Sequence, residues 1–289
     1  MKIKDFAKVS DVRGDDVFIH DGERGTKTIK ASDLPYALFE DLPLMHKNVF
    51  RGKNLGTRMT ADQIARVRDG SFKDLWIGDY WASDGMPWRI VDINYWNVHN
   101  ALTIPHLVIM PDRSLYKQSM YDNDTTSSNS FWGSKVWNSI GQCGDFASKV
   151  FDLSYIRTHV DSYMSSVAGS GGAWERYYFK SKTVDAAVKF IIPNEVMVYG
   201  CRIAVSSPMG SDGLHEVSSR QLQLFRMGYN PGAQDSDFWL RDQTYLSQYG
   251  LFGDKVVNPG APLINAPMEY AGEGLQSDQH GVRPVFAVG

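Results

Sequence analysis

The apolar runs of this chain are short, and turn-forming residues interrupt them at close intervals. The longest apolar stretch, ALTIPHLVIM, is broken by Pro105 and His106. A membrane-spanning helix needs about 20 consecutive apolar residues, so no span is expected. Runs of about four to eight apolar or aromatic residues bounded by Gly, Pro, Asn and Asp are typical of strands. The chain is therefore expected to fold into many short elements joined by turns and loops.

One segment carries a complete set of helix signals. Thr60 is a candidate N-cap, and Gln63, three residues later, completes a capping box. Ile64 and Val67 supply an apolar stripe, and Gly70 is the candidate residue just past the end. The pattern predicts a helix between Thr60 and Gly70.

Local patterns predict further short elements. One predicted helix begins at Ser32, has Pro35 in its first turn and ends near Glu40. A second spans about 133–140, and a third begins at Ser219 and stops at Gly228. The predicted strands are Val17–His20, Thr26–Ala31, 75–81, 87–96, 106–110, 195–200, 237–242 and 282–288, with turns at 21–25 and at Ser83-Asp84-Gly85. Short helices mixed with antiparallel strands indicate an α+β fold and not an alternating βαβ fold.

Charge and composition limit the function classes. The 289 residues carry a formal net charge of −3, without a run of five Lys or Arg, so the electrostatic footprint of a nucleic-acid-binding protein is missing. The length allows one large domain or two smaller ones. Trp and Tyr number 8 and 14, which fits either a large aromatic core or a recognition surface.

Motifs for catalysis, cofactors and metals do not occur. The chain has no GxSxG, GxxxxGK[ST], GxGxxG or HExxH pattern, and the nearest histidines, His99 and His106, have no metal-binding spacing. Cys143 and Cys201 form no CxxC pair and are expected to be free, buried thiols. Carboxylate spacing neither supports nor excludes a glycosidase pair. We expect no cofactor, no metal and no enzyme activity.

The acidic stretch DNDTTSSN at 122–129 resembles a calcium loop only at its start. An EF-hand needs Gly at the sixth position and Glu at the twelfth, where this chain has Ser127 and Gly133. We therefore interpret the stretch as a solvated turn.

Residues 1–45 differ from the rest of the chain. Their two predicted strands and one short helix are too few to bury much surface alone, and exposed strand edges are templates for pairing with another chain. A polar linker, residues 46–59, follows. The N-terminus has no apolar signal-peptide region, which predicts synthesis in the cytoplasm. Residues 1–45 are predicted to be an attachment and assembly segment, and residues 46–289 a second domain.

Two ordered stretches close the chain, FWLRDQTY at 238–245 and HGVRPVFAVG at 280–289, and frame a segment rich in Gly, Pro and Asn. The segment from Gln243 to His280 is expected to have neither helix nor sheet. The apolar positions of the two stretches are Trp239, Leu240, Val282, Val285 and Phe286. Each stretch also has one arginine, Arg241 or Arg283, for which we predict partial burial and a carboxylate or loop-carbonyl partner.

These stretches resemble the closing part of C-type-lectin-like domains, in particular the subgroup that includes formylglycine-generating enzymes. DGSFKDLWIGDYW and WRIVDINYW resemble segments of phage and prophage proteins, and GTKTIKASDLPYALF resembles a virion attachment segment. The resemblance implies a domain whose final strands place these five apolar positions in the core, while the loop between the strands is exposed. It places the ligand contacts in that loop, at Tyr245, Tyr249, Phe252, Asn258, Asn265 and Tyr270.

The chain lacks the sugar-binding motifs and the copper-binding cysteines of the families that it resembles. The Glu-Pro-Asn and Trp-Asn-Asp motifs of calcium-dependent sugar-binding lectins do not occur, and PNE at 193–195 has a different order. The two cysteines are 58 positions apart and lie outside the closing segment, which does not fit the copper site of formylglycine-generating enzymes.

The function that the resemblance implies is adhesion. A phage virion protein would attach to other virion proteins through residues 1–45 and present the lectin-like domain to a host receptor or surface glycan. A homotrimer is expected, because phage fibres and spikes are commonly trimeric. Two alternatives stay open: a structural tail, baseplate or head-decoration component without a ligand, and an enzyme that degrades cell-wall polysaccharide.

Overall fold

The computed structural model describes most of the chain. The described residues are 17–22, 25–30, 33, 36, 39–122, 131, 133–167, 180–200, 220–229, 237–246, 251–257, 271–275 and 278–289. Within them, only the backbone is described at 17–22, 25–29, 98–100, 162–167, 180–184, 242–246, 251–257 and 271–275.

Short helices and mostly antiparallel strands make up the described residues, which confirms the predicted α+β class. The helices are α2 Pro43–Asn48, α3 Ala61–Arg68, η3 Tyr95–Asn100, α4 Lys135–Ser139, η4 Ile140–Gln142, α5 Cys143–Ala147, η5 Leu153–Tyr155, α6 Glu195–Tyr199 and α7 Gln223–Arg226. The strands are β1 Val17–Gly22, β2 Gly25–Lys30, β3 Tyr80–Ser83, β4 Met86–Ile93, β5 Leu107–Pro111, β6 Tyr116–Gln118, β7 Ile156–Arg157, β8 His159–Val167, β9 Lys180–Val188, β10 Phe190–Ile191, β11 Phe238–Leu246, β12 Leu251–Val257, β13 Ala271–Leu275, β14 His280–Val282 and β15 Val285–Val288.

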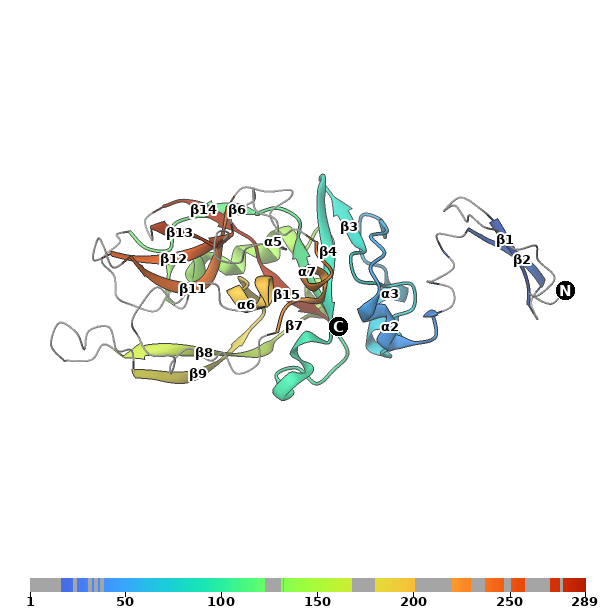
Figure 1. Cartoon of the computed structure of the whole chain (residues 1–289), viewed down its shortest axis with the longest axis horizontal. Helices are drawn as coiled ribbons and strands as arrows, with labels where there is room; N and C mark the ends of the chain where they lie inside the picture. Colours follow the sequence, from blue (N-terminus) through green and yellow to red (C-terminus); the bar gives the residue numbers. More distant parts are fainter. Residues whose placement is uncertain are drawn as a thin grey trace.

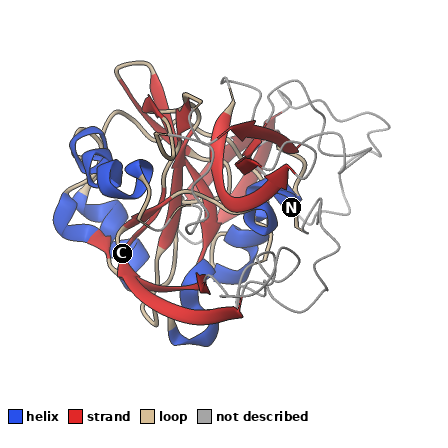
Figure 2. Ribbon diagram, turned by 90° about the vertical axis from the view of Figure 1, so that its left-hand side faces the viewer, coloured by secondary structure: helices blue, strands red, loops and turns tan. Residues whose placement is uncertain are grey.

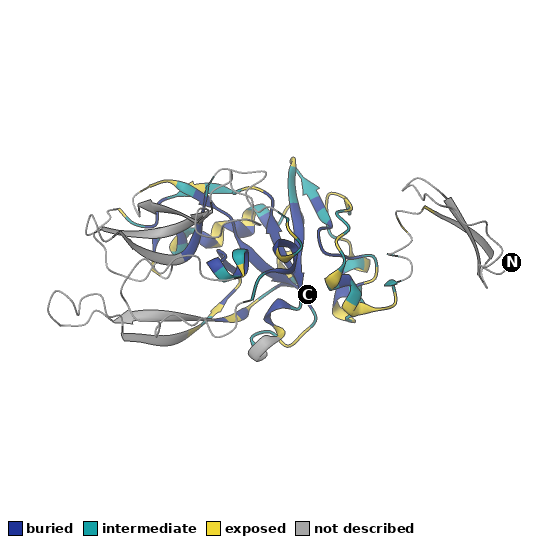
Figure 3. Ribbon diagram, in the orientation of Figure 1, coloured by how far each residue is buried: buried dark blue, intermediate teal, exposed yellow. Residues whose placement is uncertain are grey.

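The core lies on a six-stranded sheet with the order β10-β15-β5-β4-β3, in which β7 also pairs with β15. All residues of β5 and β15 are buried, as are those of β4 from Trp88 onward. Figure 3 shows this burial as a dark blue centre, and Figure 2 shows short helices around the strands. The last strand of the chain is thus a central strand of the main sheet (Figure 1).

A second sheet has the order β13-β12-β11-β14-β6. Its strands pair antiparallel except β11 and β14, which are parallel and aligned at Phe238 and Gly281. The predicted strand 282–288 is in fact two strands, β14 in this sheet and β15 in the main sheet. Pro284 lies between them, where its missing N–H and fixed φ interrupt a sheet ladder.

Two hairpins stand outside these sheets. β1 and β2 form an antiparallel pair in which Val17 lies opposite Lys30, and their positions agree with the predicted N-terminal strands. β8 and β9 pair in the register His159 to Val188. This second hairpin was not predicted from the sequence, because the polar residues of its strands show no clear alternation.

Local signals formed as predicted at α3 and at the β3–β4 turn. The Thr60 side chain accepts from the Gln63 amide, and the Gln63 side chain accepts from the Thr60 amide. Gly70 follows the helix with a φ of +73°. Asp84 and Gly85 both have positive φ, at 52° and 72°, as a two-residue hairpin turn requires.

Four predicted elements were wrong in type or extent. Residues 195–200 form the helix α6 and not a strand, because the Asn194 side chain caps its start and Gly200 ends it at a φ of +82°. Residues 75–79 lie before β3 and outside it, and Tyr95 and Trp96 belong to η3. Helix α7 has Leu222 at its N-cap position, without a side-chain cap, although Gly228 follows its end at a φ of +87° as expected.

Several predictions fall wholly or largely outside the described residues. These are the helix from Ser32 to Glu40, most of the polar stretch at 122–129, Ser219 and Cys201. Cys143 is a buried free thiol, as expected, and burial raises its pKa to about 12.

Candidate functional site

The predicted ligand segment contains more regular structure than expected. Strands β12 and β13 lie within it, and β11 extends to Leu246, so the expectation of a segment without sheet was wrong. Gly253, Gly272 and Gly274 occupy ladder positions opposite Leu275, Val256 and Asp254. Backbone pairing with neighbouring strands outweighs the weak strand preference of glycine here.

Two of the six predicted ligand residues lie in this sheet. Tyr245 on β11 and Phe252 on β12 are directly opposite in the antiparallel register. Cross-strand neighbours of this kind have Cβ atoms about 4.5–5.5 Å apart, so the two positions form one pair. Tyr249, Asn258, Asn265 and Tyr270 lie outside the described residues.

The inner half of β11 is fixed in the core. Trp239 and Leu240 are fully buried, and the Trp239 indole N–H donates to the Gln118 carbonyl at 2.6 Å. Arg241 is only 5% exposed, and its guanidinium pairs with the buried Asp161 carboxylate of β8. Its amide also donates to the Pro193 carbonyl at 3.1 Å. Arg241 therefore has the carboxylate partner expected of it, with deeper burial than predicted.

The second arginine holds the crossing between the two sheets. Arg283 is 2% exposed, again more buried than predicted, and its Nε donates to the Pro111 carbonyl at 2.5 Å. Its guanidinium carbon lies 4.9 Å from the centre of the Phe238 ring. Phe286, two residues past Pro284, is fully buried and packs against Trp88, Phe151 and Phe190. The closing residues thus serve the core that supports the β11–β13 sheet.

Gly281 permits a close backbone approach at the same crossing. A Cβ atom at this position would lie 2.0 Å from Ser114 Oγ and 3.0 Å from the Asp237 carbonyl oxygen. The Gly281 amide donates to that Asp237 carbonyl at 2.9 Å. Only a residue without a side chain fits here, which gives a physical reason for the glycine of the GVRP sequence.

A buried carboxylate joins three distant segments. Asp92 at the end of β4 is fully buried and accepts two hydrogen bonds from the Arg220 guanidinium, at 2.6 and 2.8 Å. It also accepts from the Gln223 amide at 2.9 Å and lies 3.6 Å from the Lys47 ammonium. Burial lowers the pKa of Lys47, an effect that Asp92 opposes.

Two buried histidines flank an indole beside this network. The rings of His159 and Trp96 are stacked with centroids 3.8 Å apart, and His106 lies on Trp96 at 6.0 Å. Burial lowers the pKa of His159 to about 3, with a further contribution from the positive Arg241. Burial likewise lowers the pKa of His106 to about 4. Both rings are neutral at pH 7 and serve packing.

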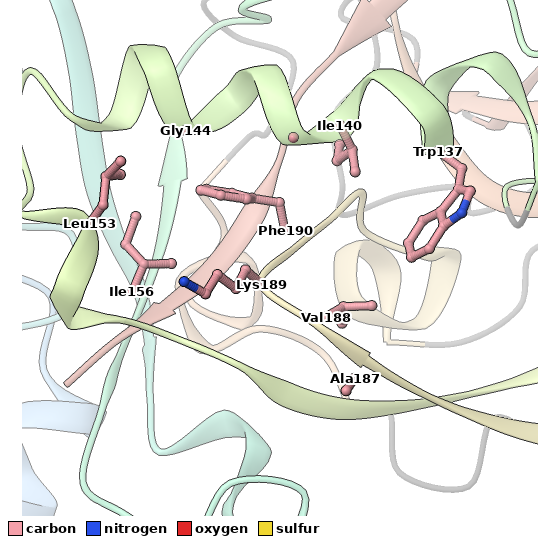
Figure 4. A pocket seen from close by; sticks show the side chains of 10 residues that line it. Trp137, Ile140, Gly144, Leu153, Ile156, Ala187, Val188, Lys189 and Phe190 are labelled. Carbon is pink, nitrogen blue, oxygen red and sulfur yellow. The ribbon is translucent and has the colours of Figure 1, made fainter.

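An open pocket of about 380 Å³ lies on another part of the domain, between the α4–α5 helical stretch and the β9–β10 strands (Figure 4). Its lining comes from three places in the chain: Trp137, Ile140, Gly141 and Gly144 on the helical stretch, Leu153 and Ile156 from η5 and β7, and Ala187, Val188, Lys189 and Phe190 from the strands. Every lining side chain except that of Lys189 is predominantly apolar.

The sequence carries a signal for this pocket that the pattern analysis overlooked. Trp137, Ile140, Gly141 and Gly144 follow the spacing of three and four residues that places side chains on one helix face. An aromatic residue beside two glycines on one face leaves a hollow next to a flat wall. The opposite wall comes from β10, about 50 positions later, and no local pattern indicates it.

Among the described residues, no group of His, Cys, Asp or Glu is arranged to hold a metal ion. None of the helices in that part of the chain has the length and hydropathy of a membrane span. Comparison with protein families, curated proteins and solved structures finds no match to this chain. Its function is therefore inferred from its residues and their geometry.

Proposed function

We propose that this chain is a phage virion surface protein whose C-type-lectin-like domain attaches the particle to a host receptor or surface glycan. The domain acts as a binding module and not as an enzyme. The proposal starts from the resemblance of the two closing stretches and of the N-terminal segment. Residues 1–45 join the protein to the particle, and residues 46–289 are displayed.

One observation carries the proposal. The first residues of β11 are buried in the core, and its outer residues pair with β12, which lies within the predicted ligand segment. Trp239 and Arg241 fix the base, while the outer pair Tyr245–Phe252 belongs to the β11–β12 hairpin. In Figure 1, β11, β12 and β13 lie at the end of the domain away from α2 and α3, which come after β2 in the chain. A rigid base with a projecting hairpin suits recognition, since binding then costs less ordering entropy.

The experiment is a double substitution at the outer pair, Tyr245→Ala with Phe252→Ala. Binding of the purified, labelled protein to a panel of bacterial cells and to a glycan array is measured for both forms. Loss of two aromatic anchors is expected to weaken binding by about 2 kcal/mol or more, roughly thirtyfold in Kd. The proposal requires both side chains to face a ligand and not the core, so thermal stability is expected to stay within about 1 kcal/mol of the parent.

Ile104→Ala is the control, because Ile104 is 40% exposed and lies outside both residues 1–45 and the β11–β12 hairpin. It should leave binding unchanged. Unchanged cell binding together with impaired particle assembly in the double variant would instead favour the structural alternative. Release of reducing sugar from cell walls by the parent protein would favour the enzyme.

The attachment role has a separate test. An isolated two-stranded hairpin such as β1–β2 is at best marginally stable in water, so a partner surface is expected to hold it. Deleting residues 1–45 should leave a folded monomer that no longer joins the particle. Light scattering would show the full chain as a trimer and the shortened chain as a monomer; normal assembly of the shortened chain would contradict this role.

A further inference from the structure

The pocket between α4–α5 and β9–β10 is hollow because two lining residues have no side chain. A Cβ atom at Gly141 would meet no atom within 4 Å, and one at Gly144 would lie 3.8 Å from Phe190. Neither glycine has a positive φ, so backbone strain does not account for the choice of glycine. The glycines keep space open beside Trp137.

The walls of the pocket are suited to an apolar chain. Ile140, Ile156, Val188 and Phe190 are buried, and Trp137 is half-buried. Ligand pockets commonly have volumes of about 300–1,000 Å³ and mostly apolar walls with few polar groups, and this pocket lies at the small end of that range. A glycan needs many hydrogen-bonding partners, whereas most of the lining side chains carry no polar group.

The only charged side chain in the lining is that of Lys189. Its ammonium lies within 4 Å of no carboxylate among the described residues. In Figure 4, the Lys189 amine and the Trp137 indole lie toward opposite ends of the pocket. The helical stretch from Trp137 to Gly144 advances about 10 Å at 1.5 Å per residue, which sets the length of a fitting ligand.

We propose that this pocket binds a slender amphiphile with an unbranched apolar body about 10 Å long and a terminal carboxylate or phosphate. The body lies along the glycine face between Trp137 and Phe190. The anionic end pairs with the Lys189 ammonium. This site is independent of the adhesion surface on β11–β13, and either proposal can fail without the other.

Decanoate, kept below its micelle concentration, is the probe, and isothermal titration calorimetry of the full chain is the readout. Saturable one-site binding is expected. Gly141→Leu fills the hollow and should weaken binding at least tenfold, while Gln142→Leu, which places a leucine at the neighbouring position outside the pocket lining, should leave it unchanged. Circular dichroism verifies that each variant is folded, and Trp137→Ala, which removes a wall, provides a second loss of affinity.

Lys189→Met tests the anionic end. It should weaken decanoate and decyl phosphate about tenfold and leave decanol unaffected. Vesicles of phosphatidylglycerol separate a free amphiphile from a lipid surface, and no vesicle binding is expected. The proposal is overturned if the parent chain does not bind decanoate, if Gly141→Leu binds it as well as the parent, if Lys189→Met has no selective effect, or if only vesicles bind.

Discussion

Replacing Asp92 by Asn is expected to destabilise the fold by about 3 kcal/mol. The carboxylate is fully buried, accepts hydrogen bonds from Arg220 and the Gln223 amide, and forms an ion pair with Lys47. Asparagine keeps the shape but removes the charge and directs an NH₂ group at one of these donors. Breaking a buried ion pair by changing one partner costs about 3–5 kcal/mol.

The lower end of that range applies because the partners are not fully enclosed. The side chains of Arg220 and Lys47 are 34% and 28% exposed, so water can solvate both cations after the change. Water cannot solvate the Gln223 amide in the same way, because Gln223 is only 8% exposed. Part of the loss should therefore appear as local opening of the segment that contains this amide.

Urea unfolding of the parent and Asp92→Asn proteins gives the change in free energy, and hydrogen exchange of the Gln223 amide reports the local opening. Asp62→Asn is the control: Asp62 also pairs with an arginine, at 2.5 Å, but is 71% exposed. The control should change stability by less than about 1 kcal/mol, as exposed pairs do. An Asp92→Asn protein within that same margin, with an unchanged dependence on urea, would refute the reasoning.

Three further changes test the core and its charges. Gly281→Ala should cost about 1–3 kcal/mol in a melting experiment because its Cβ would overlap the Ser114 side chain, and adding Ser114→Gly should recover part of that loss. Phe286→Ala should cost about 3–5 kcal/mol in urea unfolding; an unchanged curve would contradict the place of β15 in the core. The folded-state pKa of His159 is lowered to about 3, so the unfolded chain binds more protons below pH 6.5 and stability falls from there toward pH 3. His159→Phe, which can still stack on Trp96, should remove about 2 kcal/mol of that acid loss at pH 5, and an acid-unfolding curve identical to the parent's would contradict this.

The proposals of adhesion and of amphiphile binding concern different surfaces. Tyr245 and Phe252 lie on the β11–β12 hairpin, whereas Gly141 and Lys189 line a pocket formed by other elements. Variants at one surface therefore act as folded controls for the other. Loss of both activities in a single-site variant would indicate unfolding and not a specific effect.

The sequence by itself determined the elements whose signals are local. The capping box of Thr60 and Gln63, the stop at Gly70 and the turn at Asp84-Gly85 involve residues no more than four positions apart. Their hydrogen bonds and φ preferences act before any tertiary contact forms. The burial of Trp239 and Phe286 was expected from the resemblance of the closing stretches, and both side chains are fully buried.

The prediction of a strand at 195–200 was wrong because the residue types of this segment favour a strand, whereas the residues at its two ends favour a helix. Val196, Val198 and Tyr199 favour a strand by type, but the Asn194 cap and the left-handed Gly200 satisfy the ends of a helix. The helix also buries Met197 and Val198. Propensity is a weak prior, and packing together with the end caps decided the outcome.

Only the tertiary structure decided the charge partners, the sheet order and the pocket. Arg241 was expected to find a carboxylate, but Asp161 lies 80 positions away on the unpredicted strand β8, and the Pro111 carbonyl that accepts from Arg283 is 172 positions away. The pocket likewise needs β10 to face the glycines of the α4–α5 stretch. The physical reason is common to all three: local signals act over one turn of chain, whereas these contacts exist only after distant segments have paired and excluded water.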